Sequence, residues 1–141
     1  MKLRPANLGD SELLLQWRND PITRQFSLKV GVVEQSEHEK WLRESLVNPQ
    51  RRIYIAEIGG DPVGTIRTDF DGEFHELSWT VAPERRSQGV GKELVSTLVK
   101  MIAQPIRATI KKENLASIRI AKQAGLIFEG EKDGMLCFTR R

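Results

Sequence analysis

The chain has 141 residues, 39% hydrophobic and 29% charged, which suits one folded domain over residues 1–141 and excludes a disordered protein. A net charge of +3 is compatible with an anionic ligand, but the basic residues are scattered, so we expect no nucleic-acid partner. No apolar run could span a membrane, and residues 1–10 lack the apolar core of a signal peptide, which predicts a cytoplasmic protein. The single cysteine, Cys137, excludes an internal disulfide and a cysteine-based zinc cluster, and no metal is expected.

The N-terminal part is predicted to begin with a short strand over residues 2–5. Asp10 then stands where a helix N-cap is expected, and the helix should stop before Pro21. Three apolar residues of this helix define its buried face: Leu13, Leu14 and Trp17. Residues 20–34 show no clear periodicity and predict a loop.

A second helix and three strands follow. Ser36 and Glu39 have the spacing of a capping box, which predicts a helix that runs to about Asn48. Alternating apolar residues bounded by turn residues then predict three strands, at 52–58, 63–69 and 74–81. Two antiparallel hairpins are the simplest connection between them.

The C-terminal part contains a helix over residues 89–103 and a short buried strand over residues 106–110. Asn114 is expected to cap a last helix that ends at Gly125. Two final strands, 126–131 and 135–139, flank a tight turn. The element order β-α-α-β-β-β-α-β-α-β-β combines hairpins with one βαβ crossover, so the predicted class is α+β with a mixed, mostly antiparallel sheet.

Cationic and glycine residues gather at the junction 83-PERRSQGVGKEL-94, between the third of those strands and the helix after it. A helix N-terminus offers free N–H groups to an anion, and Gly89 and Gly91 would let a phosphate approach the backbone. The junction is not a P-loop, because Arg86 and Glu93 stand where that motif needs glycine and a hydroxyl residue. It is not a dinucleotide fingerprint either, because its third glycine would be Leu94. The alternative is that both glycines serve helix packing only.

The stretch 86-RSQGVG-91 matches the R/Q-x-x-G-x-G/A signature of the GNAT acetyltransferases. The preceding residues, 76-ELSWTVAPER-85, resemble the fourth strand and the start of the pyrophosphate loop in that family. Further on, 114-NLASIRIAKQAGLIFEG-130 resembles the second motif of the family. Because the predicted element order also agrees, the resemblance covers nearly the whole chain, and it implies a single GNAT-like domain with a splay between the fourth and fifth strands.

The resemblance implies acetyl-CoA as the acetyl donor. Its pyrophosphate would rest on the loop and the helix start, which comprise Arg86, Ser87, Gln88, Gly89, Val90, Gly91 and Lys92. The pantetheine arm would lie in the splay and pair with backbone near Trp79 and Val81, where a strand N–H would also stabilise the tetrahedral intermediate. Asn114 and Ser117 would border the cofactor, a role for Asn114 that is compatible with helix capping.

Two neighbouring residues are candidates for the proton transfer that a primary amine requires. Glu76 is the leading candidate for the base and His75 the second, and strand geometry allows only one of them to face the cleft. Water alone remains the alternative. The sequence departs from the family at Ala121, where many members carry a tyrosine that protonates the leaving thiolate, and Cys137 is a weak substitute that is expected to pack instead.

The N-terminal part resembles the acceptor side of two branches, which acetylate nucleotide-linked amino sugars of the pseudaminic-acid type or the N-termini of ribosomal proteins. Five residues are candidates for acceptor binding: Trp17, Arg18, Asn19, Arg24 and Trp41. Core packing is an equal alternative for the two tryptophans. We expect a small-molecule amine as the acceptor, with a protein N-terminus or a non-catalytic acyl-CoA-binding module as alternatives. The sequence leaves the oligomeric state open, a homodimer included.

Overall fold

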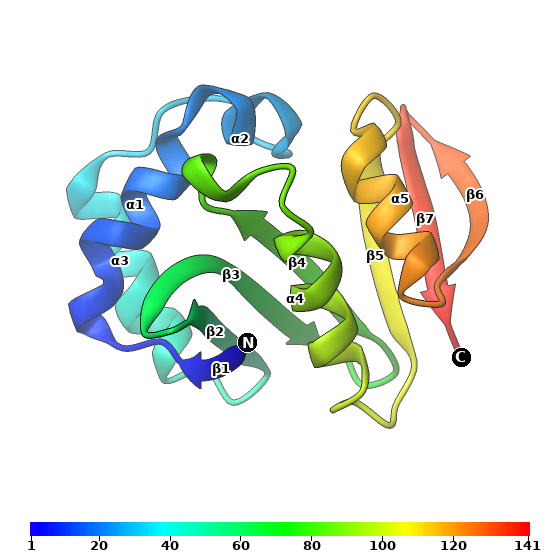
Figure 1. Ribbon diagram of the computed structural model, residues 1–141, viewed down its shortest axis with the longest axis horizontal. Coiled ribbons are helices and arrows are strands. Elements are labelled where there is room, and N and C mark those ends of the chain that lie inside the picture. The colour runs from blue at the N-terminus through cyan, green and yellow to red at the C-terminus, as the bar shows by residue number, and fades with distance from the viewer.

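A computed structural model describes residues 1–141 and shows one seven-stranded sheet, with strand order β1-β2-β3-β4-β5-β7-β6 (Figure 1). The strands are β1 (Lys2–Pro5), β2 (Arg51–Ile58), β3 (Asp61–Phe70), β4 (His75–Val81), β5 (Ile106–Lys111), β6 (Ile127–Lys132) and β7 (Met135–Arg140). All neighbouring strands are antiparallel except β4 and β5, which are parallel. This confirms the α+β class and the mixed sheet that the sequence predicts.

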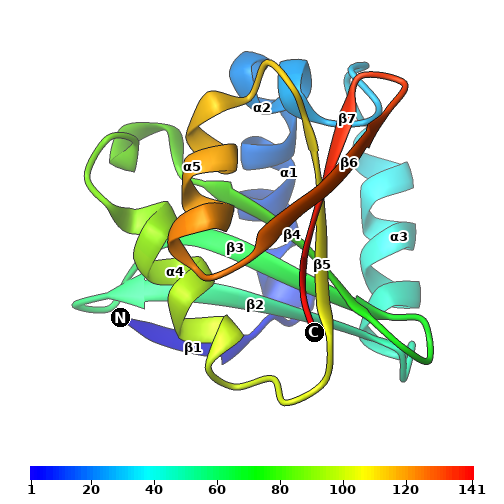
Figure 2. The same ribbon diagram turned by 90° about the vertical axis from the view of Figure 1, so that its right-hand side faces the viewer.

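Helices cover both faces of the sheet. They are α1 (Ser11–Asn19), α2 (Pro21–Phe26), α3 (Gln35–Leu46), α4 (Val90–Val99) and α5 (Leu115–Gln123), with 3₁₀ turns at Leu8–Asp10 and Pro83–Arg85. Figure 2 shows α4 and α5 on one side of the sheet and α3 on the other. None of these helices combines the length and the apolar character that crossing a bilayer demands.

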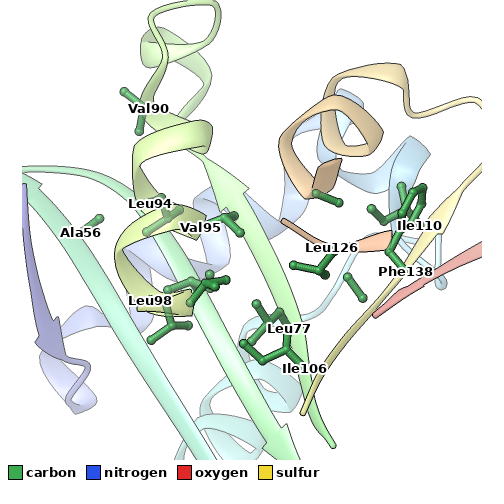
Figure 3. Packing of buried hydrophobic residues seen from close by; sticks show 14 of the residues in the cluster. Ala56, Leu77, Val90, Leu94, Val95, Leu98, Ile106, Ile110, Leu126 and Phe138 are labelled. Atoms are coloured by element: carbon green, nitrogen blue, oxygen red, sulfur yellow. The ribbon is translucent and has the colours of Figure 1, made fainter. Parts of the chain in front are cut away.

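Two hydrophobic cores hold these layers together. The larger lies between the sheet and helices α4 and α5, where Leu94 and Leu98 of α4 pack with Leu77 of β4 and Ile106 of β5 (Figure 3). The smaller joins α1 and α3 to β2 on the opposite face. Leu94 and Leu98 are almost fully buried, and each contributes about 1.5–3 kcal/mol toward holding α4 on the sheet.

Helix α2 lies where the sequence predicts a loop, so that prediction is wrong for residues 21–26. The local chemistry nevertheless favours a helix start. Asp20 accepts a hydrogen bond from the N–H of Thr23 at 3.1 Å, and Pro21 occupies the first helical position. The helix is short and has no buried residue, so it leaves no apolar period by which it could be recognised.

Some helix boundaries also differ from the prediction. The Asp10 side chain does not cap α1, because it accepts hydrogen bonds from Arg4 at 2.8 and 2.9 Å and from the N–H of Asn7. Helix α3 begins at Gln35, so Ser36 lies inside it and makes no capping box. Helix α4 ends at Val99 rather than at residue 103. The Asn114 cap is confirmed, since its side chain accepts from the N–H of Ser117.

Candidate active site

The parallel strands β4 and β5 pair over two residues only and then diverge. Their ladder joins His75 to Ile106 and Glu76 to Arg107, and it continues no further (Figure 1). The splay that the resemblance implies is therefore present. The two strands pair at the end that contains His75 and Ile106, and they leave a gap in the sheet beyond Glu76 and Arg107.

The backbone of β4 beyond this point offers hydrogen bonds to the gap. The N–H of Ala82 donates to Val63 of β3, whereas the N–H of His75 donates to Pro105 on the β5 side. Because the pairing of β3 and β4 has no register shift, N–H and C=O groups alternate between these two directions. Trp79 and Val81 therefore direct their backbone groups toward β5, where no strand pairs with them.

A row of free backbone donors lies at the start of α4. Gly89 is the N-cap with φ of 78°, and Ser87 also has a positive φ, of 63°. The first hydrogen bond of the helix runs from the N–H of Glu93 to the carbonyl of Gly89, at 3.2 Å. Six consecutive N–H groups before it find no acceptor within the protein, namely those of Ser87, Gln88, Gly89, Val90, Gly91 and Lys92. Together with the helix dipole they fit a phosphate or pyrophosphate group.

Glycine is favoured at positions 89 and 91 of this loop for two different structural reasons. A Cβ at Gly89 would meet nothing within 4 Å, so the positive φ alone favours glycine there. Gly91 is buried, and a Cβ on it would lie 2.6 Å from Cδ1 of Ile120 and 3.3 Å from Cγ2 of Val81. Gly91 thus allows α5 to pack closely against α4. This is the helix-packing role that the sequence analysis gives as the alternative to phosphate binding.

Arg86 makes contacts other than the one expected from the sequence. Its guanidinium donates to Asp20 at 2.5 Å and to the hydroxyl of Thr23 at 3.2 Å, which ties the loop to α2. Although partial burial acts in the opposite direction, the bonds from Arg86 and from the N–H of Thr23 hold the pKa of Asp20 below its usual range. Lys92 is exposed and pairs with no carboxylate, so its charge is free to act on an anion bound at the helix start.

Glu76 and His75 point to opposite faces of β4. The carboxylate of Glu76 accepts from Nε of Arg107 at 2.8 Å and from the hydroxyl of Thr109 at 3.4 Å. The ring of His75 lies 4.5 Å from that of Phe70, and both ring nitrogens are buried without a partner. Of the two candidates, only Glu76 has its polar atoms among polar side chains.

Arg107 is a site residue that the sequence did not single out. It donates to Glu76 and, at 3.1 Å, to Asp71, and the bond to Glu76 is the main reason that the pKa of its guanidinium is raised. A charged residue within the mostly apolar strand 106-IRATI-110 is the signal that could have identified it. The register places this pair directly beside Asp69, which is itself held by Arg51 and Arg67.

The position of the missing tyrosine is filled by packing. Ala121 is completely buried in the core beneath α5 and has no group that could protonate a thiolate. Cys137 lies on β7 beside Thr109, and burial raises the pKa of its thiol. Ala121 therefore cannot take over the role of the tyrosine, and the Cys137 thiol stays protonated.

The candidate acceptor residues mostly serve the structure of the N-terminal part. Trp17 is 2% exposed and belongs to the core that joins α1 and α3 to the sheet. Asn19 exchanges two hydrogen bonds with the backbone of Val33, while Arg18 and Arg24 donate to the carbonyls of Lys29 and Val30. These three side chains anchor the segment 29–33.

Trp41 is half-buried beneath the guanidinium groups of Arg51 and Arg67, which lie 5.6 and 5.5 Å from the centre of its ring. The ring also packs against His38 of the same helix. Its face is therefore occupied by cations of the sheet.

Comparison with known proteins gives a consistent result. Residues 1–127 match the family described as the acetyltransferase (GNAT) domain. No curated protein sequence matches the chain. A solved ribosomal-protein-alanine N-acetyltransferase from Brucella melitensis is 23% identical, with a TM-score of 0.80 and 99% of each chain covered.

Two further solved structures show the same fold. Aminoglycoside acetyltransferase AAC(6')-Ib, in complex with coenzyme A and kanamycin, is 20% identical with a TM-score of 0.83, over 99% of this chain and 93% of that one. RimL, a ribosomal L7/L12 alpha-N-protein acetyltransferase in complex with coenzyme A, is 16% identical with a TM-score of 0.85, over 98% and 92% of the two chains. At these identities the likeness establishes only the arrangement of the elements. The substrate of this chain has to be inferred from the residues of its own site.

Proposed function

Because this chain belongs to the GNAT family of acetyltransferases, we propose that it transfers the acetyl group of acetyl-CoA to a primary amine. The observation that carries the proposal is the row of unbonded N–H groups from Ser87 to Lys92, which adjoins the gap between β4 and β5. The loop suits the pyrophosphate of coenzyme A, and the gap suits its extended pantetheine arm. The solved acetyltransferases that share this fold and carry coenzyme A support the same assignment.

The chemistry requires a neutral amine, whose lone pair attacks the thioester carbonyl carbon to form a tetrahedral intermediate. The carbon–sulfur bond then breaks and coenzyme A leaves as the thiolate. In our proposal Trp79 and Val81 supply the backbone groups that align the thioester, and a β4 N–H stabilises the developing oxyanion. Glu76 accepts a proton from the amine, directly or through one water. Arg107 and Thr109 hold the carboxylate in place for this step.

For the acceptor we propose a small polar amine, with amino sugars as the first class to test. The support is the polar character of the sheet face around Glu76, where Ser78 of β4 and Thr109 of β5 are exposed next to the charged side chain of Arg107. Hydroxyl and guanidinium groups of this kind suit a ligand with several hydroxyl groups.

The experiment is a screen of thiol release from acetyl-CoA against amino sugars, polyamines and peptides with free N-termini. Faster release with amino sugars than with the other two classes is the expected result. A preference for peptides would replace the proposed acceptor with a protein N-terminus. Absence of coenzyme A binding in calorimetry would overturn the donor assignment as well.

A further inference from the structure

The indole N–H of Trp79 is buried and has no hydrogen-bond acceptor. Only four buried side-chain nitrogens of the chain lack a partner, and they belong to Arg18, His75 and Trp79. A buried tryptophan N–H normally finds an acceptor, because leaving it without one costs the full penalty of removing it from water. An orphaned donor of this kind indicates either a defect in packing or an acceptor that a ligand supplies.

The position of Trp79 on β4 favours the ligand. The ladder between β4 and β5 ends at Glu76 and Arg107, three residues before Trp79. If the parallel register were continued, Trp79 would lie opposite Ile110 of β5, across the open part of the gap. The backbone of Trp79 therefore borders the open part of the gap, and its side chain stands on the sheet face beside that opening.

No acceptor of the protein bonds the indole nitrogen, and the surroundings of the ring are apolar. Trp79 lies two residues from Leu77 and on the same face of β4, so it packs against the core beneath α4 and α5. This core consists of hydrocarbon side chains, including those of Ile110 and Ala121.

We propose that the Nε1–H of Trp79 donates a hydrogen bond to an acceptor atom of the acetyl-CoA arm, either an amide carbonyl of pantetheine or the oxygen of the thioester. This inference rests on the proposed function, because it needs the arm to lie in the gap. Indole is a donor that does not release its proton at neutral pH, so Trp79 aligns or polarises the arm and does not protonate the thiolate. Its role is thus distinct from that of the missing tyrosine.

The test combines a variant with a spectroscopic readout on the unaltered protein. In Trp79→Phe an aromatic ring remains in the core while the donor is lost, and Trp41→Phe is the matched control on α3. Calorimetry with coenzyme A and with acetyl-CoA measures the loss of affinity, and we expect it to be roughly fivefold, as for one neutral hydrogen bond. Trp41 is a candidate on the acceptor side only, so Trp41→Phe should leave the affinities for these two donor compounds unchanged, whatever it does to the reaction with an amine.

The indole resonances of the unaltered protein provide the independent readout. The chain has three tryptophans, and the two variants assign their ¹⁵N–¹H signals. On titration with coenzyme A or acetyl-CoA, the Trp79 signal should move to lower field and exchange more slowly with solvent, whereas the Trp17 signal stays in place. This result does not depend on the stability of any variant.

The possible outcomes separate the two levels of the proposal. If the unaltered protein binds neither compound, the proposed function fails. If it binds both but the Trp79 signal does not respond and Trp79→Phe binds equally well, the donor role of Trp79 is overturned and the proposed function stands. Weaker binding of both compounds by Trp79→Phe would identify an amide carbonyl as the acceptor, and a lower kcat with unchanged coenzyme A affinity would identify the thioester oxygen.

Discussion

The substitution Glu76→Gln tests the proposed base most directly. Glutamine keeps the length of the side chain, and its amide oxygen can still accept the hydrogen bond that Arg107 donates to Oε1 of Glu76 at 2.8 Å. Its amide cannot take a proton from the amine. We therefore expect kcat to fall about 10²-fold with acetyl-CoA affinity retained, which is the low end for loss of general base catalysis.

The structure allows this effect to be separated from a loss of stability. A factor of about 10² in rate corresponds to about 2.7 kcal/mol of barrier. The Glu76 and Arg107 side chains are 27% and 31% exposed, and ion pairs near the surface contribute about 0–1 kcal/mol to folding. Chemical denaturation of Glu76→Gln should therefore show a change in the free energy of unfolding of less than about 1 kcal/mol.

Two measurements complete the test. The rate deficit of Glu76→Gln should shrink at high pH, where more of the amine is already neutral. Asp71→Asn is the matched control, because it removes the other carboxylate that Arg107 contacts and leaves β4 intact. Full activity of Glu76→Gln across the pH range, combined with loss of activity in His75→Ala, would refute the reasoning, and if neither change matters then solvent is the base.

Three further predictions concern the loop and the helices around it. Gly91→Ala should lower the free energy of unfolding by about 1 kcal/mol through its contact with Ile120, while calorimetry should show that coenzyme A still binds. Adding Ile120→Val should remove most of that cost. If the two substitutions destabilise the protein additively in chemical denaturation, the packing role is wrong. Asp20→Asn should strengthen coenzyme A binding a few-fold at low salt because it leaves the charge of Arg86 unbalanced, and calorimetry that shows weaker binding would count against this. Burial, and to a lesser degree the charge of Arg18, lowers the pKa of His38 against the pull of Glu39. The unfolded chain then binds more protons than the folded one near the usual pKa of histidine, so stability is lost as the pH falls below about 6.5, and His38→Gln should melt with a smaller decrease in Tm between pH 7 and pH 5.

Local patterns in the sequence determined most of the elements of this protein. The period of Leu94 and Leu98, the cap at Asn114 and the turn at Asp133 and Gly134 depend on residues close to one another along the chain. Both turn residues have the positive φ that a two-residue hairpin turn requires. The loop of free N–H groups before α4 could be predicted for the same reason, because these groups follow from a strand, a glycine and a helix in immediate succession.

The roles of the individual polar side chains were decided by the tertiary structure. Arg18 and Arg24 each donate to a carbonyl of the segment 29–33, a contact that no local pattern announces. Arg86 binds Asp20, which lies 66 residues away, and Glu76 binds Arg107, 31 residues away. The sequence shows that a charged or hydrogen-bonding side chain needs a partner, but it does not show which residue that partner is. Which partner it finds depends on how the sheet register and the docking of α2 bring distant segments within about 3 Å, and no local pattern encodes that distance.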